Sequence, residues 1–129
     1  MARESSLFQY AAPKRLHALA TRWVPRCAWL ALALLLPGLW LALVATPADA
    51  VQGEGYRILY VHVPAAWMSM WLYAVIAFWS AVGLIWRTRA SFLMAHALAP
   101  TGAVFALLSL VTGALWGKPM WGTWWVWDA

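Results

Sequence analysis

Charged side chains are scarce in this sequence. Aspartate, glutamate, lysine and arginine together make up 10% of the 129 residues, whereas hydrophobic residues make up 65%. A soluble globular domain carries about 25% charged residues, so this chain lacks the charge needed to cover a water-facing surface. The composition predicts a membrane protein of one small domain. The net charge of +5 does not indicate a nucleic-acid partner, because the basic residues flank apolar segments and suit membrane lipid.

Cysteine is nearly absent too. Cys27 stands alone, which excludes an intrachain disulfide and a CxxC pair for metal binding or redox chemistry. We interpret Cys27 as an apolar filler of a helix. The sequence also lacks internal repeats and a nucleotide-binding loop.

Charge is missing altogether from three apolar stretches, at about residues 27–45, 64–86 and 92–116. Each is close to the roughly 20 helical residues that cross a bilayer. The predicted fold is therefore all-α: a polytopic transmembrane protein with three spanning helices. A basic leader (1–26) precedes them and an external tryptophan-rich segment (117–129) follows. Pro37 and Pro100 are expected to bend the first and third helices.

The first apolar stretch has a second interpretation, as a cleaved signal peptide. Ala48-Asp49-Ala50 resembles a cleavage site. However, the hydrophobic part of a signal peptide has about 7–15 residues. The stretch at 27–45 is longer and follows a long basic leader, so a retained span is the prediction.

Basic residues are distributed unevenly around the three stretches. Two of them, Arg57 and Lys118, lie on one side of the predicted membrane, and seven lie on the other. The seven are Arg3, Lys14, Arg15, Arg22, Arg26, Arg87 and Arg89. By the positive-inside rule, the N-terminus is predicted to be cytoplasmic. The loop at 46–63 and the tryptophan-rich segment are then expected on the outer side.

Tryptophan, by contrast, is abundant, and it gathers at the C-terminal end. The last nine residues contain Trp121, Trp124, Trp125 and Trp127, and Trp116 lies just upstream. On a backbone made permissive by glycine, these rings are expected to form a flat aromatic platform. Such a platform suits a large, planar, apolar ligand, for which a porphyrin is the obvious candidate in a membrane protein.

The backbone around the platform is also predicted. Gly117-Lys118-Pro119 is expected to end the third helix, which leaves the tryptophan-rich segment as an amphipathic element in the outer interface. Gly113 and Gly117 form a GxxxG pattern, which is expected to let another helix pack closely against this one. Trp67 and Trp71, in the second stretch, either extend the platform or contact lipid.

Three histidines are candidate ligands. Pro64 suits the first position of the second helix, which would leave His62 just outside it, at the outer membrane surface. Neutral imidazole there can coordinate a metal or haem iron, or it can simply bond to backbone or water. His96 is interpreted as a helix-packing residue near the cytoplasmic end, too far from His62 to share one haem with it. His17 is expected to be solvated.

Two motifs carry a family resemblance. Trp-Gly-Thr-Trp-Trp-Val-Trp-Asp at 121–128 resembles the WWD signature of haem-handling proteins in cytochrome c maturation. Val-His-Val-Pro-Ala-Ala-Trp-Met-Ser at 61–69 resembles the first external histidine motif of the CcmC family (haem exporter protein C). The resemblance runs from about Tyr56 to Ala129, over more than half of the chain.

The resemblance implies a site and a set of partners. His62 would be the first axial ligand of haem b (iron protoporphyrin IX), and the haem platform would comprise Trp116, Trp121, Trp124, Trp125, Trp127 and Asp128. The family presents haem at the outer face of the bacterial inner membrane to the chaperone CcmE. The ABC transporter subunits CcmA and CcmB and the small membrane subunit CcmD complete the system. The resemblance therefore implies that any ATP hydrolysis belongs to these partners and that the chain itself is not an enzyme. Arg57 or Lys118 would pair with the haem propionates, or serve as interfacial anchors.

The family pattern continues past the WWD signature with further spans and a second external histidine, so this sequence is expected to be a fragment or an incomplete product. Two other functions stay open. A haem-b electron carrier would need histidine pairs within the bilayer. A cofactor-free membrane anchor would show no haem absorption at all.

Overall fold

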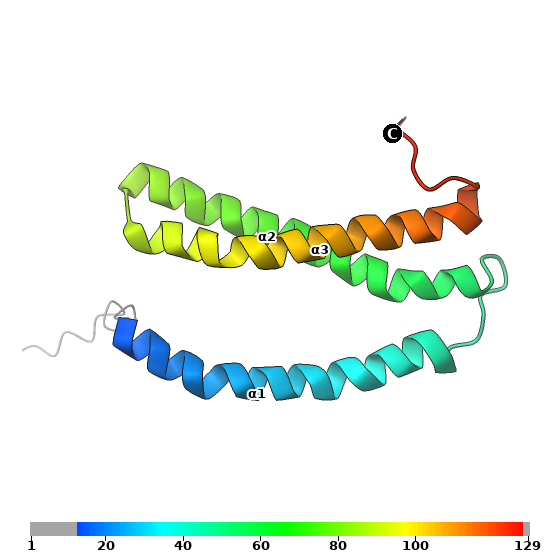
Figure 1. Ribbon diagram of the computed structural model, residues 1–129, viewed down its shortest axis with the longest axis horizontal. Helices are drawn as coiled ribbons and strands as arrows, with labels where there is room; N and C mark the ends of the chain where they lie inside the picture. Colours follow the sequence, from blue (N-terminus) through cyan, green and yellow to red (C-terminus); the bar gives the residue numbers. More distant parts are fainter. Residues whose placement is uncertain (1–12, 128–129) are drawn as a thin grey trace, which may run out of the picture. The chain divides into compact units, whose positions relative to one another are not determined.

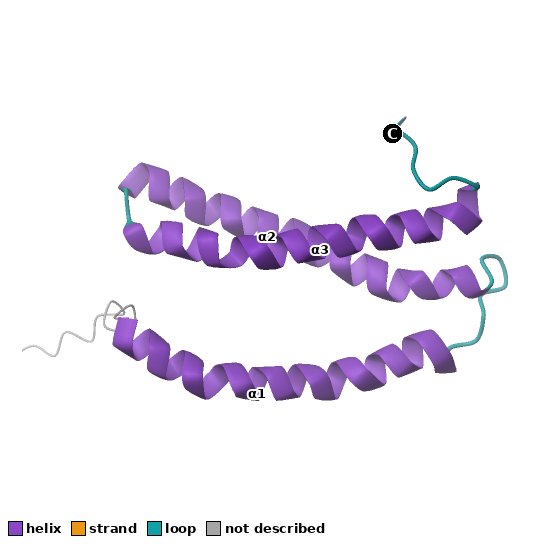
Figure 2. Cartoon of the chain, in the orientation of Figure 1, coloured by secondary structure: helices purple, strands orange, loops and turns teal. Residues whose placement is uncertain are grey.

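The computed structural model describes residues 13–127, apart from the side chains of Pro13, Lys14 and Leu16. These residues form helices joined by short loops (Figures 1 and 2), and the only strand-like pairing among them is one bridge between Asp49 and Gly53. Three helices are long and apolar enough to cross a membrane. The prediction of an all-α, polytopic membrane fold is confirmed.

The first helical segment comprises α1 (Pro13–Trp40) and the π-helical turn η2 (Leu41–Ala45). It begins well before the predicted span at 27–45. The physical reason is that the leader contains good helix formers such as Ala, Leu and Arg. The chain stays helical through Pro25 and Pro37, and the π-helical turn begins four residues after Pro37.

The second segment begins earlier than predicted as well. A short 3₁₀ helix, η3 (Glu54–Ile58), leads directly into α2 (Leu59–Trp86). Pro64 therefore lies inside α2 rather than at its start. Proline inside a membrane helix is tolerated when neighbouring groups satisfy the freed backbone carbonyl, so Pro64 was a misleading start signal.

α3 (Arg89–Trp121) follows α2 after a two-residue turn, with Arg87 in the left-handed conformation. α3 passes through Pro100 and also through Gly117-Lys118-Pro119, which was predicted to end it. The stop lies at Gly122, whose positive φ of 77° closes the helix while its N–H donates to the Lys118 carbonyl. Glycine adopts this conformation without steric cost.

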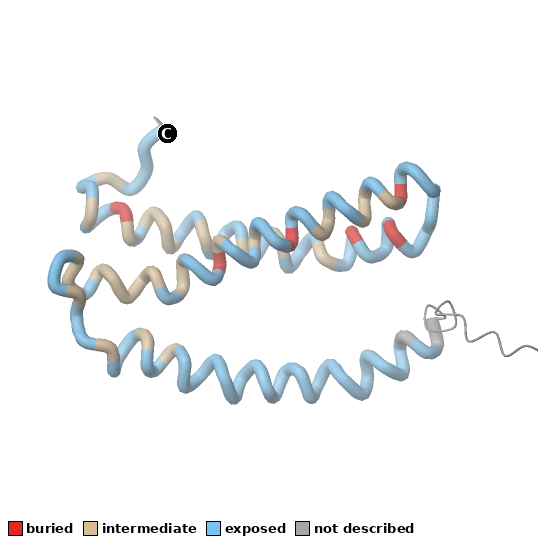
Figure 3. The backbone as a smooth tube through the Cα atoms, turned by 180° about the vertical axis from the view of Figure 1, so that it is seen from behind, coloured by how far each residue is buried: buried red, intermediate tan, exposed pale blue. Residues whose placement is uncertain are grey.

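α2 and α3 pack side by side and run in opposite directions (Figure 1). Every buried residue of the described chain lies on these two helices (Figure 3). Buried and half-buried positions recur at alternating spacings of three and four, as expected for helices that pack along their length. On α2 this seam comprises His62, Ala65, Ser69, Leu72, Ile76, Trp79 and Gly83. On α3 it comprises Ser91, Ala95, Leu98, Gly102, Phe105, Ser109, Thr112 and Trp116.

Two glycines allow the helices of the pair to approach closely. At the turn end, a Cβ on Gly83 would lie 3.1 Å from the ring of Phe92. At the opposite end, a Cβ on Gly113 would lie 3.0 Å from Cε1 of His62. The outward faces stay apolar and exposed, with Trp67 and Trp71 both about two-thirds exposed. Such faces suit a lipid environment, in which apolar side chains need no covering.

Candidate functional site

His62 lies in the first turn of α2, and the prediction that it sits outside the helix is wrong. Its half-buried imidazole faces α3, where Nδ1 lies 3.1 Å from the Ser109 carbonyl and 3.1 Å from Thr112 Oγ1. Nε2 makes no hydrogen bond within the described chain. It is not sealed off either, because the only buried side-chain nitrogen or oxygen without a partner among the described residues is Arg57 Nη1.

A cleft of about 270 Å³ opens beside His62. The end of α3 forms one side of it, and the segment after Trp121 folds back to form another. Ligand pockets commonly measure about 300–1,000 Å³, so this smaller cleft would enclose only part of a large ligand. Its lining residues are His62, Gly113, Ala114, Trp116, Gly117, Trp121, Thr123, Trp124, Trp125 and Val126.

The tryptophans do not form the flat platform that the sequence suggested. Trp116 and Trp121 pack edge to face, with centroids 4.8 Å apart and planes at 75°. Trp125 and Trp127 form a second such pair, at 5.6 Å and 68°. Edge-to-face packing is a favoured geometry because the positive ring edge meets the negative ring face. The rings therefore border a cleft from several directions instead of forming one plane.

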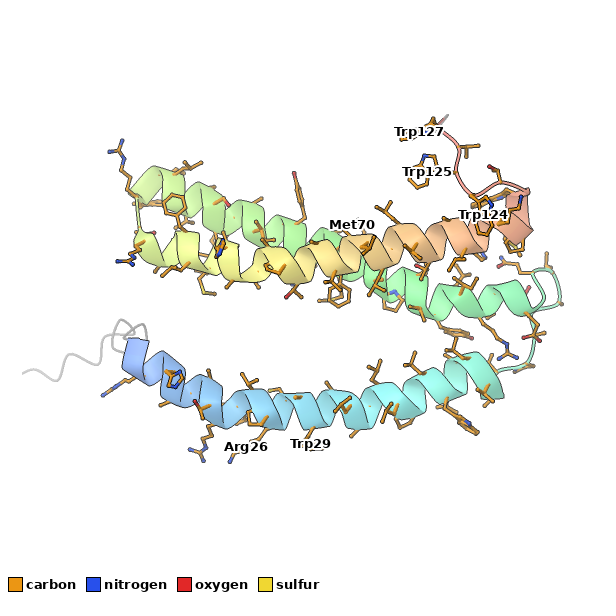
Figure 4. The ribbon with its side chains drawn as sticks, in the orientation of Figure 1. Arg26, Trp29, Met70, Trp124, Trp125 and Trp127 are labelled. Atoms are coloured by element: carbon orange, nitrogen blue, oxygen red, sulfur yellow. The ribbon has the colours of Figure 1, made fainter. Side chains whose placement is uncertain are left out.

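The segment after α3 is not a helix. Residues 122–127 have no regular secondary structure (Figure 2), and a local turn orders them, in which the Thr123 hydroxyl donates to the Trp125 carbonyl at 3.0 Å. Figure 4 shows Trp124 close to the end of α3, with Trp125 and Trp127 further along the segment. Trp124 and Trp125 are each about half exposed, so both offer ring surface to a ligand.

The loop before α2 contacts Trp116, one of the residues that line the cleft. The Trp116 indole N–H donates to Gln52 Oε1 at 3.2 Å, which satisfies the one polar group of that ring. Gln52 is held in turn by Asp49, whose Oδ1 accepts from the backbone N–H of Gln52 at 2.8 Å and of Val51 at 2.9 Å. These two hydrogen bonds hold the pKa of the Asp49 carboxyl below its ordinary value, and the bond from Gln52 has the larger effect.

Arg57 and Lys118, the two cations predicted to lie on the outer side, both have partners in the described structure. The Lys118 ammonium donates to the Gly122 carbonyl at 3.0 Å and lies 5.7 Å from the ring centre of Trp124, in cation–π range. Arg57 forms an ion pair with Glu54, and its side chain is 17% exposed. Lys118 therefore helps to order the tryptophan segment, and neither residue lines the cleft.

The structure brings together five of the predicted site residues at one cleft: His62, Trp116, Trp121, Trp124 and Trp125. Trp127 is 91% exposed and joins only through its contact with Trp125. Asp128 lies outside the described residues. The sequence interpretation missed Gln52, Ser109, Thr112 and the contact between Gly113 and His62, because no local motif marks residues that meet only when two helices pack.

His96 and His17 stay apart from the cleft. His96 lies sixteen residues before Thr112 on α3, which corresponds to about 24 Å along the helix axis. His96 and His62 are thus too far apart to bind the same iron. His96 is exposed in the described structure. The predicted packing of His96 between helices is therefore absent from the described part of the chain. His17 is exposed too, and its carbonyl accepts from the Thr21 hydroxyl.

The chemistry of the cleft is that of one imidazole among aromatic rings. Of the described residues that line it, His62 is the only one whose side chain readily binds a transition metal. The described residues thus offer a metal one side-chain ligand, which suits a metal that already carries other ligands and an apolar surface, as the iron of a porphyrin does. The cleft therefore fits a flat metallated ring better than a bare ion.

Comparison with known proteins points the same way. The model of the family described as CcmC, heme exporter protein C, matches residues 6–129. Heme exporter protein C of Haemophilus influenzae is 48% identical over 123 residues, which cover 95% of this chain and 50% of that protein. Its counterpart in Escherichia coli K12 is 48% identical over 128 residues, 96% of this chain and 51% of that protein.

A plant relative extends the range of sources. The putative cytochrome c biosynthesis ccmC-like mitochondrial protein of Marchantia polymorpha is 50% identical over 91 residues, 70% of this chain and 40% of that protein. The chain thus spans about half the length of the bacterial relatives it matches, and the matched half contains His62 and the WWD segment.

Proposed function

This chain belongs to the heme exporter protein C family, and from that premise we propose that it binds haem at the outer face of the membrane and presents it to a haem chaperone for cytochrome c maturation. The observation that supports this most strongly is His62, which lines a cleft of tryptophans and whose Nε2 makes no hydrogen bond within the described chain. The haem is cargo, held long enough to be passed on.

Each part of the cleft has a physical task in this proposal. His62 Nε2 coordinates the iron on one side of the ring, because neutral imidazole is a good iron ligand. Trp121, Trp124 and Trp125 cover apolar parts of the macrocycle and exclude water from it. A cleft that is open and only partly enclosing suits release, since a deeply buried ring would dissociate slowly.

The direction and the partners belong to the same proposal. Seven of nine basic residues flank the predicted cytoplasmic side, which supports an outer, periplasmic position for the cleft at a bacterial inner membrane. The receiving protein is the chaperone CcmE, and CcmA, CcmB and CcmD form the rest of the assembly. A reporter fused after Ala129 is expected to signal the outer compartment, and a cytoplasmic signal would overturn this orientation.

The function is tested by the absorption spectrum of the chain purified with its chaperone partner. The parent is expected to show a Soret band. Replacing Trp124 and Trp125 by alanine removes two aromatic contacts, each worth about 0.5–1.5 kcal/mol beyond area burial, and should lower haem retention. The matched control replaces Trp67 and Trp71, which are similarly exposed but lie on α2 away from the cleft.

The outcome also decides between the alternatives. Haem retained equally by both double variants would refute the cleft as the binding site. A parent without a Soret band would favour the cofactor-free anchor. Haem that cycles in a redox titration but never reaches the chaperone would favour the electron carrier, although the separation of His62 from His96 argues against a shared bis-histidine site.

A further inference from the structure

Hydrogen bonds from α3 fix which nitrogen of His62 carries the proton. The Ser109 carbonyl oxygen, 3.1 Å from Nδ1, can only accept a hydrogen bond. Nδ1 must therefore be the N–H, and in neutral imidazole Nε2 then keeps its lone pair. The nitrogen with the free lone pair is the one that makes no hydrogen bond within the described chain.

Thr112 reinforces the same arrangement. Its hydroxyl donates to the Leu108 carbonyl, one helical turn back, at 2.6 Å. With its proton committed there, Thr112 Oγ1 presents a lone pair to His62 Nδ1, 3.1 Å away. The N–H of Nδ1 is thus shared between two acceptors on α3, Ser109 O and Thr112 Oγ1. Both acceptors stabilise the same tautomer and the same ring orientation.

Gly113 lets the ring come close enough for these bonds. A Cβ at this position would meet Cε1 of His62 at 3.0 Å and Nδ1 at 3.5 Å. The imidazole therefore packs against bare helix backbone. Three features on a single face of α3 surround the ring: the carbonyl of Ser109, the hydroxyl of Thr112 and the bare backbone at Gly113.

We propose that Thr112 is a positioning residue for haem binding: together with the Ser109 carbonyl it holds His62 in the Nδ1–H tautomer, with Nε2 ready to coordinate iron. This inference rests on the proposed function. Outer-sphere partners of metal-binding histidines commonly do this, and their loss typically costs about 10–100-fold in metal affinity. Because the Ser109 carbonyl remains when Thr112 is changed, the lower end of that range is expected here.

The test compares Thr112→Val, which removes the acceptor at constant shape, with Thr112→Ser, which keeps it. Thr101→Val is the matched control, since Thr101 is exposed on the same helix. His17 and His96 are replaced by glutamine, so that the only labelled histidine is His62. Its ¹⁵N spectrum is recorded in lipid nanodiscs without haem, and the affinity for ferric haem is then titrated.

The parent, Thr112→Ser and Thr101→Val are expected to show His62 protonated at Nδ1 alone. In Thr112→Val the Ser109 carbonyl remains as the acceptor, so Nδ1–H is expected to stay the main form, with a detectable Nε2–H fraction and about 10-fold weaker haem binding. An unchanged tautomer and affinity in Thr112→Val would overturn the inference while leaving the proposed function intact. A parent that binds no haem, whatever its tautomer, would instead overturn the proposed function on which the inference rests.

Discussion

The two ends of the α2–α3 pair are built alike, yet they have different chemistry. At each end a glycine on one helix receives a ring from the other: Gly83 receives Phe92 at the turn, and Gly113 receives His62 at the open end. Phe92 needs only space, because its ring has no polar atoms. His62 also needs hydrogen-bond partners, and Ser109 and Thr112 supply them. The same packing arrangement is therefore structural at one end and suited to ligand binding at the other.

The residues around the two ends of the α2–α3 pair differ as well. The turn end contains Thr88 and Ser91, whose hydroxyls bond to each other at the start of α3. The open end contains the tryptophan-lined cleft and the loop that braces it through Gln52. Function is therefore expected to be sensitive to changes at the open end, and only stability to changes at the turn.

The largest effect is expected from removing the imidazole itself. In His62→Ala the haem affinity should fall by at least 10-fold, because the iron ligand is lost, whereas outer-sphere partners alone are worth about 10–100-fold. His96→Ala is the control. His96 is exposed and lies about 24 Å along α3 from Thr112, the residue of α3 that contacts His62. Haem titration followed at the Soret band measures both. If His96 proves essential and His62 silent, the haem site lies elsewhere.

The two glycines separate packing from ligand binding. Alanine at Gly83 or Gly113 places a Cβ about 3 Å from a ring. Overpacking of this kind costs about 1–3 kcal/mol, which the better helix propensity of alanine, worth about 0.8–1.0 kcal/mol, partly offsets. Both variants should therefore unfold slightly more easily in a denaturant titration.

Haem affinity should distinguish the two glycine variants. Gly113→Ala pushes His62 away from Ser109 and should weaken haem binding, whereas Gly83→Ala should leave it unchanged. Equal haem affinity in the two variants would show that the contact between Gly113 and His62 serves packing only.

A smaller effect is expected where the loop braces the cleft. Gln52→Leu removes the acceptor of the Trp116 indole N–H and should destabilise the cleft by about 1 kcal/mol, the usual net value of one hydrogen bond. The ¹⁵N shift of the Trp116 indole and the haem affinity report the change. Gln52→Glu keeps an acceptor oxygen and serves as the control. An unchanged indole shift in Gln52→Leu would mean that the loop does not brace the ring.

The smallest effect is expected from lowering the pH, which acts on the turn at Asp49. The carboxylate of Asp49 accepts N–H bonds from Gln52 and Val51, which lower its pKa below the ordinary value of 3.8. The stability that these bonds contribute is present above that value and is lost as the pH falls through the lower folded pKa. NMR titration of the Asp49 carboxyl should therefore show a midpoint below 3.8, with the turn loosening only in stronger acid. A midpoint above 3.8 would contradict this arrangement.

Much of the architecture could be predicted from the sequence because it depends on local quantities. Three charge-free stretches and a tenth of the residues charged were enough to predict an all-α membrane fold. Helix ends were predicted less well, because Pro64 and Gly117-Lys118-Pro119 both resemble boundary signals. In the structure α2 and α3 continue through them, and the real stop of α3 depends on the conformation of Gly122.

The site could be predicted only in part, for a related reason. His62 and the tryptophans were visible as motifs. Ser109 and Thr112, by contrast, lie 47 and 50 residues after His62, and only the register of α2 against α3 brings them to it. The orientation of the rings likewise depends on tertiary contacts such as that between Trp116 and Trp121.

Pulsed electron paramagnetic resonance can show whether His62 Nε2 binds haem iron at the tryptophan cleft. The chain is prepared with ¹⁵N-labelled histidine and with His17 and His96 replaced by glutamine, and ferric haem is added in lipid nanodiscs. Hyperfine coupling of the iron to one directly bound ¹⁵N is expected, and this coupling should disappear in His62→Ala. Haem that is retained with coupling only to the porphyrin ¹⁴N atoms would contradict it.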